Sequence, residues 1–364
     1  MKRARDLGIP FDGVPGPWNA ITDVLGVEVG YTTLVAGDGP LQVGVGPVRT
    51  GVSAILPRGR ASYDPVFASW FPLNGNGEMT GTAWVEESGF LEGPILLTNT
   101  HSVGLVRDAV VGWQARTGKL FQPWSLPVVA ETYDGFLNDI NGFHVKETDV
   151  LRALQTAASG PLAEGNVGGG TGMICYEFKG GTGTSSRTLN DRDGGYRVGV
   201  LVQANFGVRG QLQIAGVPVG KEITAYVPFP QRTSPDPERG SIIVVVATDA
   251  PLLPHQLKRV ARRPALGIAR TGGMAGNNSG DIFISFSTAN AGAAKPIGRL
   301  AQVKILPNDQ ITPLFEATAL ATEEAIINAL VAAETMKGVD GHIVYGLPQE
   351  ELREVLRKYR RLAT

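Results

Sequence analysis

"GGMAGNNSGDIFISFSTAN", residues 272–290, decides how this chain is interpreted, because a Gly-Asn-Asn turn runs directly into a serine at the head of a strand. From residue 281 to 287 the side chains alternate with the period of two that is typical of a β-strand. Asn and Gly tolerate the positive φ of tight turns, and a serine hydroxyl can bond to the local backbone. Taken alone, the stretch fits a structural turn as well as a turn that presents Ser279 for chemistry.

The chemical interpretation needs a base, because a serine hydroxyl is a weak nucleophile until its proton is removed. One solution uses no histidine. The chain is cut before the serine, and the new α-amine, with a pKa of about 7.7–8.0, becomes the base. Strain in the turn would help Ser279 attack the carbonyl of Asn278. The GxSxG pattern of a nucleophile elbow is absent, since position 277 is Asn.

Composition narrows the class of protein. The chain has 364 residues, 43% of them hydrophobic and 18% charged, which is enough apolar material to bury a core. Its net charge of −1 does not favour nucleic acid or an anionic membrane as a partner. We find no stretch of about 18 apolar residues and no apolar core of a signal peptide. A soluble, cytoplasmic protein is therefore expected.

Metal and cofactor sites are not predicted. Cys175 is the single cysteine, so neither an internal disulfide nor a cysteine-rich zinc site can form. The four histidines show neither metal-ligand spacing nor a local catalytic-triad signature. The glycine-rich segment 164–187 lacks the Gly-Lys-Ser/Thr of a phosphate loop, and its glycines precede an apparent strand. We expect tight, close-packed turns there.

Strand-like and helical patterns alternate along the chain. Short apolar runs separated by Gly and Pro dominate the first half and predict antiparallel or mixed sheet. We expect helices at 102–117, 148–159, 253–263, 312–336 and 347–363, central strands at 196–207 and 241–251, and a Pro-rich surface loop at 227–240. Together these elements predict a layered α/β sandwich.

The segment 312–336 is alanine-rich and nearly apolar all round, so we expect it to be buried between layers. It also carries Thr322, Glu323 and Glu324. A hydroxyl and two carboxylates on such a helix are costly unless they are paired. They are candidates to organise a site, and the alternative is an exposed polar edge of the helix.

Several segments together resemble one known family. They are "RARDLGIPFDGVPGPWNAITDVLGVEVGYTTL", "PILLTNTHSVG", "PVVAETYDGFLNDINGFHV", "GNVGGGTGM", "FKGGTGTSSR", "GVLVQANFG", "IIVVVATDAPLLPHQLKRVARR", "GNNSGDIFISFSTAN" and "ATEEAIINAL". The chain resembles the autoproteolytic aminopeptidase/esterase family, peptidase family S58. That family includes the L-aminopeptidase D-Ala-esterase/amidase and the β-peptidyl aminopeptidases. The resemblance spans nearly the whole chain.

The resemblance implies a single domain with a four-layer αββα sandwich, like that of the N-terminal-nucleophile hydrolases but with different strand connectivity. It implies that the chain cleaves itself between Asn278 and Ser279, giving an α chain of residues 1–278 and a β chain of residues 279–364. Ser279 is the nucleophile, Tyr133 the active-site tyrosine and Asn205 the oxyanion-stabilising amide. Glu131, just before this tyrosine, is the candidate for holding the substrate's free amine.

The family's hydroxyl-x-glutamate pair, which supports the nucleophile, falls on Thr322 and Glu324. The hydroxyl residue is Thr here instead of Ser, and a shift of one residue would select Glu323 instead.

The implied function is a self-processing serine hydrolase that releases N-terminal residues from small peptides, amides or esters through an acyl-enzyme on Ser279. The base is either the α-amine of Ser279 or the Thr322/Glu324 pair. A homotetramer or larger homo-oligomer is expected, without metal or organic cofactor. Two alternatives remain: a related autoproteolytic acyltransferase or biosynthetic amidase, and a non-catalytic binding protein that uses "GNNSGD" only as a turn.

Overall fold

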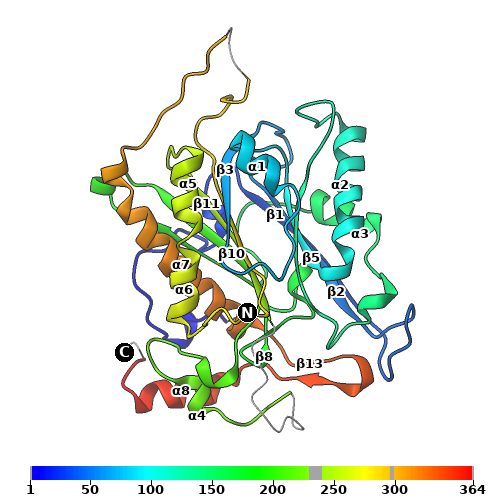
Figure 1. Cartoon of the computed structure of the whole chain (residues 1–364). Helices are drawn as coiled ribbons and strands as arrows, with labels where there is room; N and C mark the ends of the chain where they lie inside the picture. Colours follow the sequence, from blue (N-terminus) through cyan, green and yellow to red (C-terminus); the bar gives the residue numbers. More distant parts are fainter. Residues whose placement is uncertain (1, 229–239, 296–298, 363–364) are drawn as a thin grey trace.

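The computed structural model describes residues 2–228, 240–295 and 299–362. Most of the Pro-rich stretch predicted as a surface loop, residues 229–239, therefore lies outside the described residues. Two β-sheets lie face to face at the centre, and helices cover the outer face of each sheet (Figure 1). In the described part of the chain, no helix is both long and apolar enough to cross a membrane.

The larger sheet has six strands. In spatial order they are β4 (Phe90–Leu91), β3 (Val66–Pro72), β12 (Asp281–Ser287), β11 (Ser241–Thr248), β10 (Arg197–Asn205) and β9 (Gly181–Thr188). The smaller sheet has four strands: β1 (Glu28–Ala36), β2 (Val48–Leu56), β5 (Ile95–Asn99) and β6 (Val128–Thr132). Strands β11 and β12 run parallel, as do β5 and β6, and the other pairings are antiparallel. The sheets are therefore mixed, as the sequence predicts.

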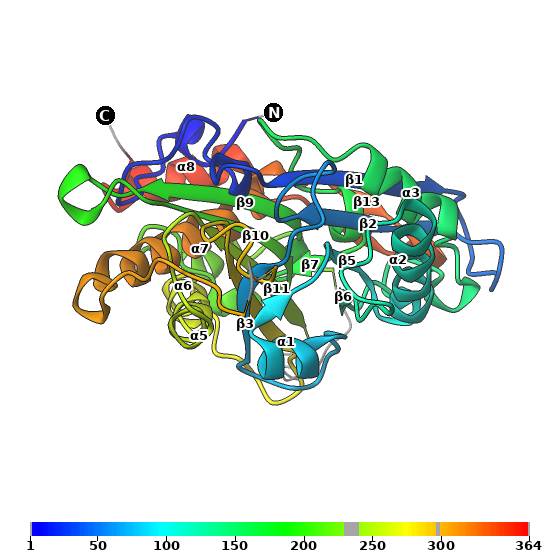
Figure 2. The same cartoon turned by 90° about the horizontal axis from the view of Figure 1, so that it is seen from above.

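The helices form the two outer layers, as Figures 1 and 2 show. On the larger sheet lie α5 (Pro254–Ala261), α6 (Pro264–Arg270) and α7 (Thr312–Ala332), and on the smaller sheet lie α2 (Val103–Thr117) and α3 (Glu147–Gln155). The remaining elements are α1 (Thr82–Ser88), α4 (Val219–Glu222), α8 (Gln349–Lys358) and two small hairpins, β7 (Ile174–Cys175) with β8 (Phe178–Lys179) and β13 (Met336–Lys337) with β14 (Ile343–Val344).

Three apolar layers separate the four structural layers. One cluster, including Ile95 and Ile284, fills the space between the two sheets. A second, including Phe283, lies between the larger sheet and its helices, and a third, including Val106, lies between the smaller sheet and α2 and α3. Along β12, Phe283 and Ile284 thus enter different cores, which is what the alternating pattern of this strand dictates. The four-layer αββα sandwich is confirmed.

Several helix predictions differ from the structure. The helices expected over 148–159 and 347–363 end early, at Gln155 and at Lys358. The helix expected over 312–336 ends at Ala332, because the chain turns to form β13 at Met336. A separate helix, α6, follows α5 and was not predicted from the pattern. Pro264 occupies its first turn, where the missing N–H costs nothing. The prediction that α7 is buried is confirmed, because only a few of its side chains reach solvent.

Candidate active site

Ser279 lies two residues before Asp281, the first residue of β12, at the sheet edge where the parallel strands β11 and β12 both begin. Its side chain is fully buried. The hydroxyl donates to Asp281 Oδ1 at 2.5 Å, and the backbone N–H donates to Gly276 O at 3.0 Å. Ser279 is therefore fixed in a turn with its oxygen directed at a carboxylate, and Asp281 joins the candidate site although no sequence motif pointed to it.

The turn before Ser279 carries its unusual backbone at a different residue from the one expected. Ala275 has a left-handed φ of 52°, whereas neither Asn277 nor Asn278 has a positive φ. Strain of this kind costs about 1–3 kcal/mol for a residue with a side chain. The strained position is thus three residues before the Asn278–Ser279 bond, and the two asparagines are held instead by hydrogen bonds.

Asn205 ends β10 and pairs with Ser241 at the start of β11. Ser241 Oγ in turn accepts a hydrogen bond from Gly280 N at 3.0 Å, so Asn205 and Ser279 lie at the same edge of the larger sheet with only β11 between their strands. Asn205 Oδ1 accepts from Ile174 N at 2.8 Å, and Nδ2 donates to Tyr133 O at 3.1 Å. These two bonds fix the orientation of the side-chain amide. A group that donates to a developing oxyanion needs such a fixed orientation.

Glu131 reaches the site from β6 of the smaller sheet. Its carboxylate accepts hydrogen bonds from Glu78 N at 2.9 Å and from the Thr100 hydroxyl. A methyl group placed on Gly77 would lie 3.2 Å from both Glu131 Oε1 and Gly280 Cα, so this carboxylate faces the Ser279 turn across a glycine. Burial raises the pKa of Glu131, since only 4% of the residue is exposed.

Tyr133 follows β6 and is 53% exposed. Its hydroxyl lies over Gly135, where any side chain would collide with the ring. Partial burial, and then the charge of Asp134, raise the pKa of Tyr133, so its hydroxyl stays protonated near neutral pH. Because the Tyr133 carbonyl accepts the hydrogen bond from Asn205 Nδ2, the position of the Asn205 amide depends on the backbone of Tyr133.

A buried lysine supports the same region. Lys179 Nζ donates to Met173 O and Gly180 O, both at 2.8 Å, and it is fully buried. Burial lowers the pKa of Lys179 to about 7. Met173 precedes Ile174, whose N–H holds Asn205, so the lysine fixes the backbone that orients the amide.

Thr322 and Glu324 lie elsewhere. Glu324 is fully buried and forms salt bridges with Arg5 at 2.7 Å and Arg187 at 2.8 Å. Burial alone would raise the pKa of Glu324, but the hydrogen bond and charges of these arginines outweigh it and hold the pKa below its usual range. Across the sheet, Arg187 is level with Ser287, the last residue of β12, whereas Ser279 precedes the first. Glu324 and its partner Arg187 therefore lie toward the opposite end of the strand from Ser279.

The other two residues of this helix segment are also engaged away from Ser279. Thr322 Oγ1 donates to Thr318 O at 2.8 Å within α7, and its side chain packs against Gly267. Glu323 bonds to Arg270 at 2.5 Å. The expected pairing of these polar groups is present: the two carboxylates have arginine partners that join α7 to the rest of the fold, and the hydroxyl bonds within the helix. In this structure Thr322, Glu323 and Glu324 thus bond to partners other than Ser279, and the support of Ser279 by the Thr322/Glu324 pair remains a prediction.

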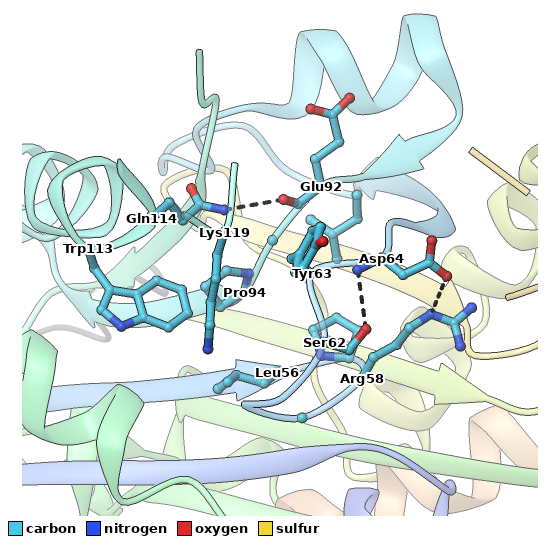
Figure 3. A pocket seen from close by; sticks show the side chains of 14 residues that line it. Leu56, Arg58, Ser62, Tyr63, Asp64, Glu92, Pro94, Trp113, Gln114 and Lys119 are labelled. Atoms are coloured by element: carbon cyan, nitrogen blue, oxygen red, sulfur yellow. Dashed lines mark hydrogen bonds and ion pairs between the residues drawn. The ribbon is translucent and has the colours of Figure 1, made fainter. Parts of the chain in front are cut away.

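Other features of the described residues do not add to this site. The pocket in Figure 3 lies beside Trp113, Lys119 and Asp64 and has a volume of about 30 Å³, which suits a water molecule and not a peptide. Ser279 is not among the 14 residues that line it. Among the residues that the structure describes, no group of three or more His, Cys, Asp or Glu side chains could hold a metal ion.

Comparisons with known proteins agree with this geometry. The model of "Peptidase family S58" matches residues 19–344. Beta-peptidyl aminopeptidase BapA of Sphingosinicella microcystinivorans is 59% identical, over 99% of this chain and 93% of that protein. The L-aminopeptidase D-Ala-esterase/amidase of Ochrobactrum anthropi, described as a new variant among the Ntn hydrolase fold, superposes with a TM-score of 0.91 at 50% identity and covers 100% of both chains. A β-aminopeptidase of Burkholderia sp. gives a TM-score of 0.89 at 50% identity, covering 98% of this chain and 99% of that one.

Proposed function

The chain belongs to peptidase family S58, and from this premise we propose that Ser279 is the nucleophile of a self-processing aminopeptidase. The protein is a serine aminopeptidase with a variant of the Ntn-hydrolase fold. Its maturation comes first: the bond between Asn278 and Ser279 breaks and leaves chains 1–278 and 279–364. The new α-amine of Ser279 then stands next to its own hydroxyl, where an amine with a pKa of about 7.7–8.0 can act as the base.

The observation that carries the proposal is the convergence on one buried serine of residues from three strands. Ser279 precedes β12, Asn205 ends β10 and Glu131 lies in β6. As Ser279 Oγ attacks the substrate carbonyl, the Asn205 amide donates to the oxygen that becomes negative. Glu131 holds the substrate's ammonium group by charge attraction. Tyr133, protonated and half-exposed beside Asn205, borders the substrate from the solvent side.

The reaction then follows acyl transfer. The leaving amine or alcohol takes a proton from the Ser279 ammonium, and the substrate's N-terminal residue remains as an ester on Oγ. Water, deprotonated by the same amine, hydrolyses this ester. We propose small peptides, amides and esters with a free N-terminal amine as the substrate class, including β-amino acyl compounds, for which two similar proteins are named.

We also propose a homo-oligomer, with a homotetramer as the expected form. Exposed apolar side chains support this proposal, with Leu25 and Leu300 each 81% exposed. A cytoplasmic location belongs to the same proposal, since a chain with one cysteine has no internal disulfide and suits a reducing compartment. Light scattering of the purified protein tests the first part and cell fractionation the second.

Hydrolysis of β-alanyl and L-alanyl p-nitroanilides by the purified enzyme, compared with a Ser279→Ala variant, tests the function. We expect release of nitroaniline by the wild type and none by the variant. Adding a free amine distinguishes the peptidase from the related acyltransferase. Preferential transfer of the acyl group to the added amine would favour the acyltransferase, whereas hydrolysis in the presence of the amine supports the peptidase. An inactive wild type would contradict the proposal.

A further inference from the structure

The peptide bond before Ser279 is held by side chains that the aminopeptidase reaction does not use. Residues 73–77, which follow β3, are hydrogen-bonded to residues 275–281 along their length. The bonds are Leu73 N and Asn74 N to Asp281 O (2.8 and 3.3 Å), Asn74 Nδ2 to Ala275 O (2.8 Å) and Gly276 O (3.0 Å), Asn76 N to Ser279 O (3.3 Å), and Asn76 Nδ2 to Asn278 O (2.8 Å). Gly280 permits this approach, because a side chain there would collide with Asn76 O.

Asn76 contacts the one oxygen on which charge would develop during self-cleavage. Its amide nitrogen is 2.8 Å from Asn278 O, the carbonyl oxygen of the bond that must break. Donors aimed at such an oxygen stabilise the tetrahedral intermediate. Asn74, two residues earlier, donates to the same turn but to the carbonyls of Ala275 and Gly276, so it holds the turn without touching the reacting bond.

Asp281 contacts the other reacting atom. Ser279 Oγ donates to Asp281 Oδ1 at 2.5 Å, and both residues are buried, at 0% and 1% exposure. The same carboxylate oxygen accepts from Ile242 N at 3.2 Å, which anchors it between β11 and β12. Before cleavage Ser279 has no α-amine, because that nitrogen is part of the peptide bond. The uncleaved chain therefore needs another base, and this carboxylate is in hydrogen-bond contact with the hydroxyl.

We propose that Asn76 and Asp281 catalyse the self-cleavage of the chain, an inference that rests on the function proposed above. Asp281 takes the proton of Ser279 Oγ while Oγ bonds to the carbonyl carbon of Asn278, closing a five-membered ring. Asn76 donates to the resulting oxyanion. The C–N bond then breaks, the nitrogen takes the proton from Asp281, and an ester joins Asn278 to Ser279 Oγ. Water hydrolyses this ester, which frees the Asn278 carboxylate and the Ser279 amine and hydroxyl.

A time course of precursor cleavage tests the proposal. The full chain is made by cell-free translation, samples are quenched in denaturant, and the 38.5 kDa precursor is quantified against its fragments. Loss of one donor from a water-excluded oxyanion site costs about 10²–10³ in rate. Because the Asn76 side chain is at the surface, we expect Asn76→Ala to slow cleavage about 10- to 100-fold. The matched control Asn74→Ala should stay within about threefold of wild type.

The base is tested by a double substitution. Asp281→Asn keeps the shape of the side chain and should slow cleavage at least about 100-fold, within the range of general-base catalysis. In a Ser279→Cys chain the same change should cost much less, because a thiol of pKa about 8.5 depends less on a base. A purely structural role would give equal losses in both chains. Thermal unfolding of each uncleaved variant checks that it folds.

The outcomes separate the two proposals. If the wild type cleaves before Ser279 while the Asn76 and Asp281 variants cleave like the Asn74 control, this inference is overturned and the proposed function stands. Equal losses from Asp281→Asn in the Ser and Cys chains would also overturn its role as base. If the wild type itself stays at 38.5 kDa, the proposed function fails, and the self-cleavage inference fails with it.

Discussion

The charge of Glu131 gives the sharpest prediction for the mature enzyme, through the substitution Glu131→Gln. Glutamine has nearly the same shape and can still accept the hydrogen bond from Glu78 N. The Thr100 hydroxyl can rotate to accept from the new amide, so the buried group keeps its partners. What is removed is the negative charge that we propose for holding the substrate's ammonium group.

The magnitude follows from the burial of this carboxylate. Two unit charges about 4 Å apart interact with about 4 kcal/mol at an effective dielectric constant near 20. The ammonium group loses hydration on binding, so we expect a net loss of about 2–4 kcal/mol, which lowers kcat/KM about 30- to 1000-fold. The assay compares β-alanyl p-nitroanilide with the same compound acetylated on its amine, for which the loss should be under about threefold.

The pH profile adds an independent test. Binding of the substrate's amine requires the negative charge of Glu131, which is present above the pKa of this side chain and is lost by protonation below it. Burial raises the pKa of Glu131 above its ordinary value, so wild-type kcat/KM should fall as the pH drops through that raised pKa. Glu131→Gln should lack this acidic limb, and Glu78→Gln serves as the matched control, with a change of a few-fold at most. An equal loss on both substrates would refute the reasoning, as would an acidic limb that persists in the variant.

Three further predictions concern residues around the site. Asn205→Ala should lower kcat about 10²–10³-fold with little change in KM, measured by steady-state kinetics on chains shown to be cleaved; a change in KM alone would contradict an oxyanion role. Glu324→Ala should lower the free energy of unfolding of the uncleaved chain by about 3–5 kcal/mol, because Arg5 and Arg187 lose their partner. The contribution of Glu324 to the free energy of unfolding should be present above its unfolded pKa and vanish as the pH falls through its lower folded pKa. The variant should still cleave itself, and a folded variant that fails to cleave would show that Glu324 takes part in self-cleavage. For Lys179, the pKa of about 7 lies below the unfolded 10.5, so wild-type stability should rise relative to Lys179→Met between those pH values in denaturant titrations, and parallel curves would contradict this.

The local pattern of apolar residues was sufficient to predict the buried elements β12 and α7. The alternation along 281–287 predicted β12, and the lack of a polar face over 312–336 predicted the buried α7, because these signals lie within neighbouring residues. The start of α6 at Pro264 escaped prediction, since a proline ends one helix or begins the next with equal ease.

Contacts between distant segments were beyond the reach of local pattern. The family resemblance places a hydroxyl-x-glutamate pair on Thr322 and Glu324, and the burial of polar groups on an apolar helix predicts only that they have partners. The partners of Glu324 are Arg5 and Arg187, more than 130 residues away, and the strand register shows that Arg187 lies far along the sheet from Ser279. Asn76 likewise bonds to Asn278, about 200 residues later in the sequence, and no spacing of residues along the chain predicts this contact.

The intact mass of the freshly purified protein under denaturing conditions tests the central claim most directly. The account predicts two fragments that meet at Asn278–Ser279, the smaller of which begins with Ser279 and is acylated there by a serine-directed reagent. A single 38.5 kDa species that stays intact for days, or fragments that meet at another bond, would contradict it.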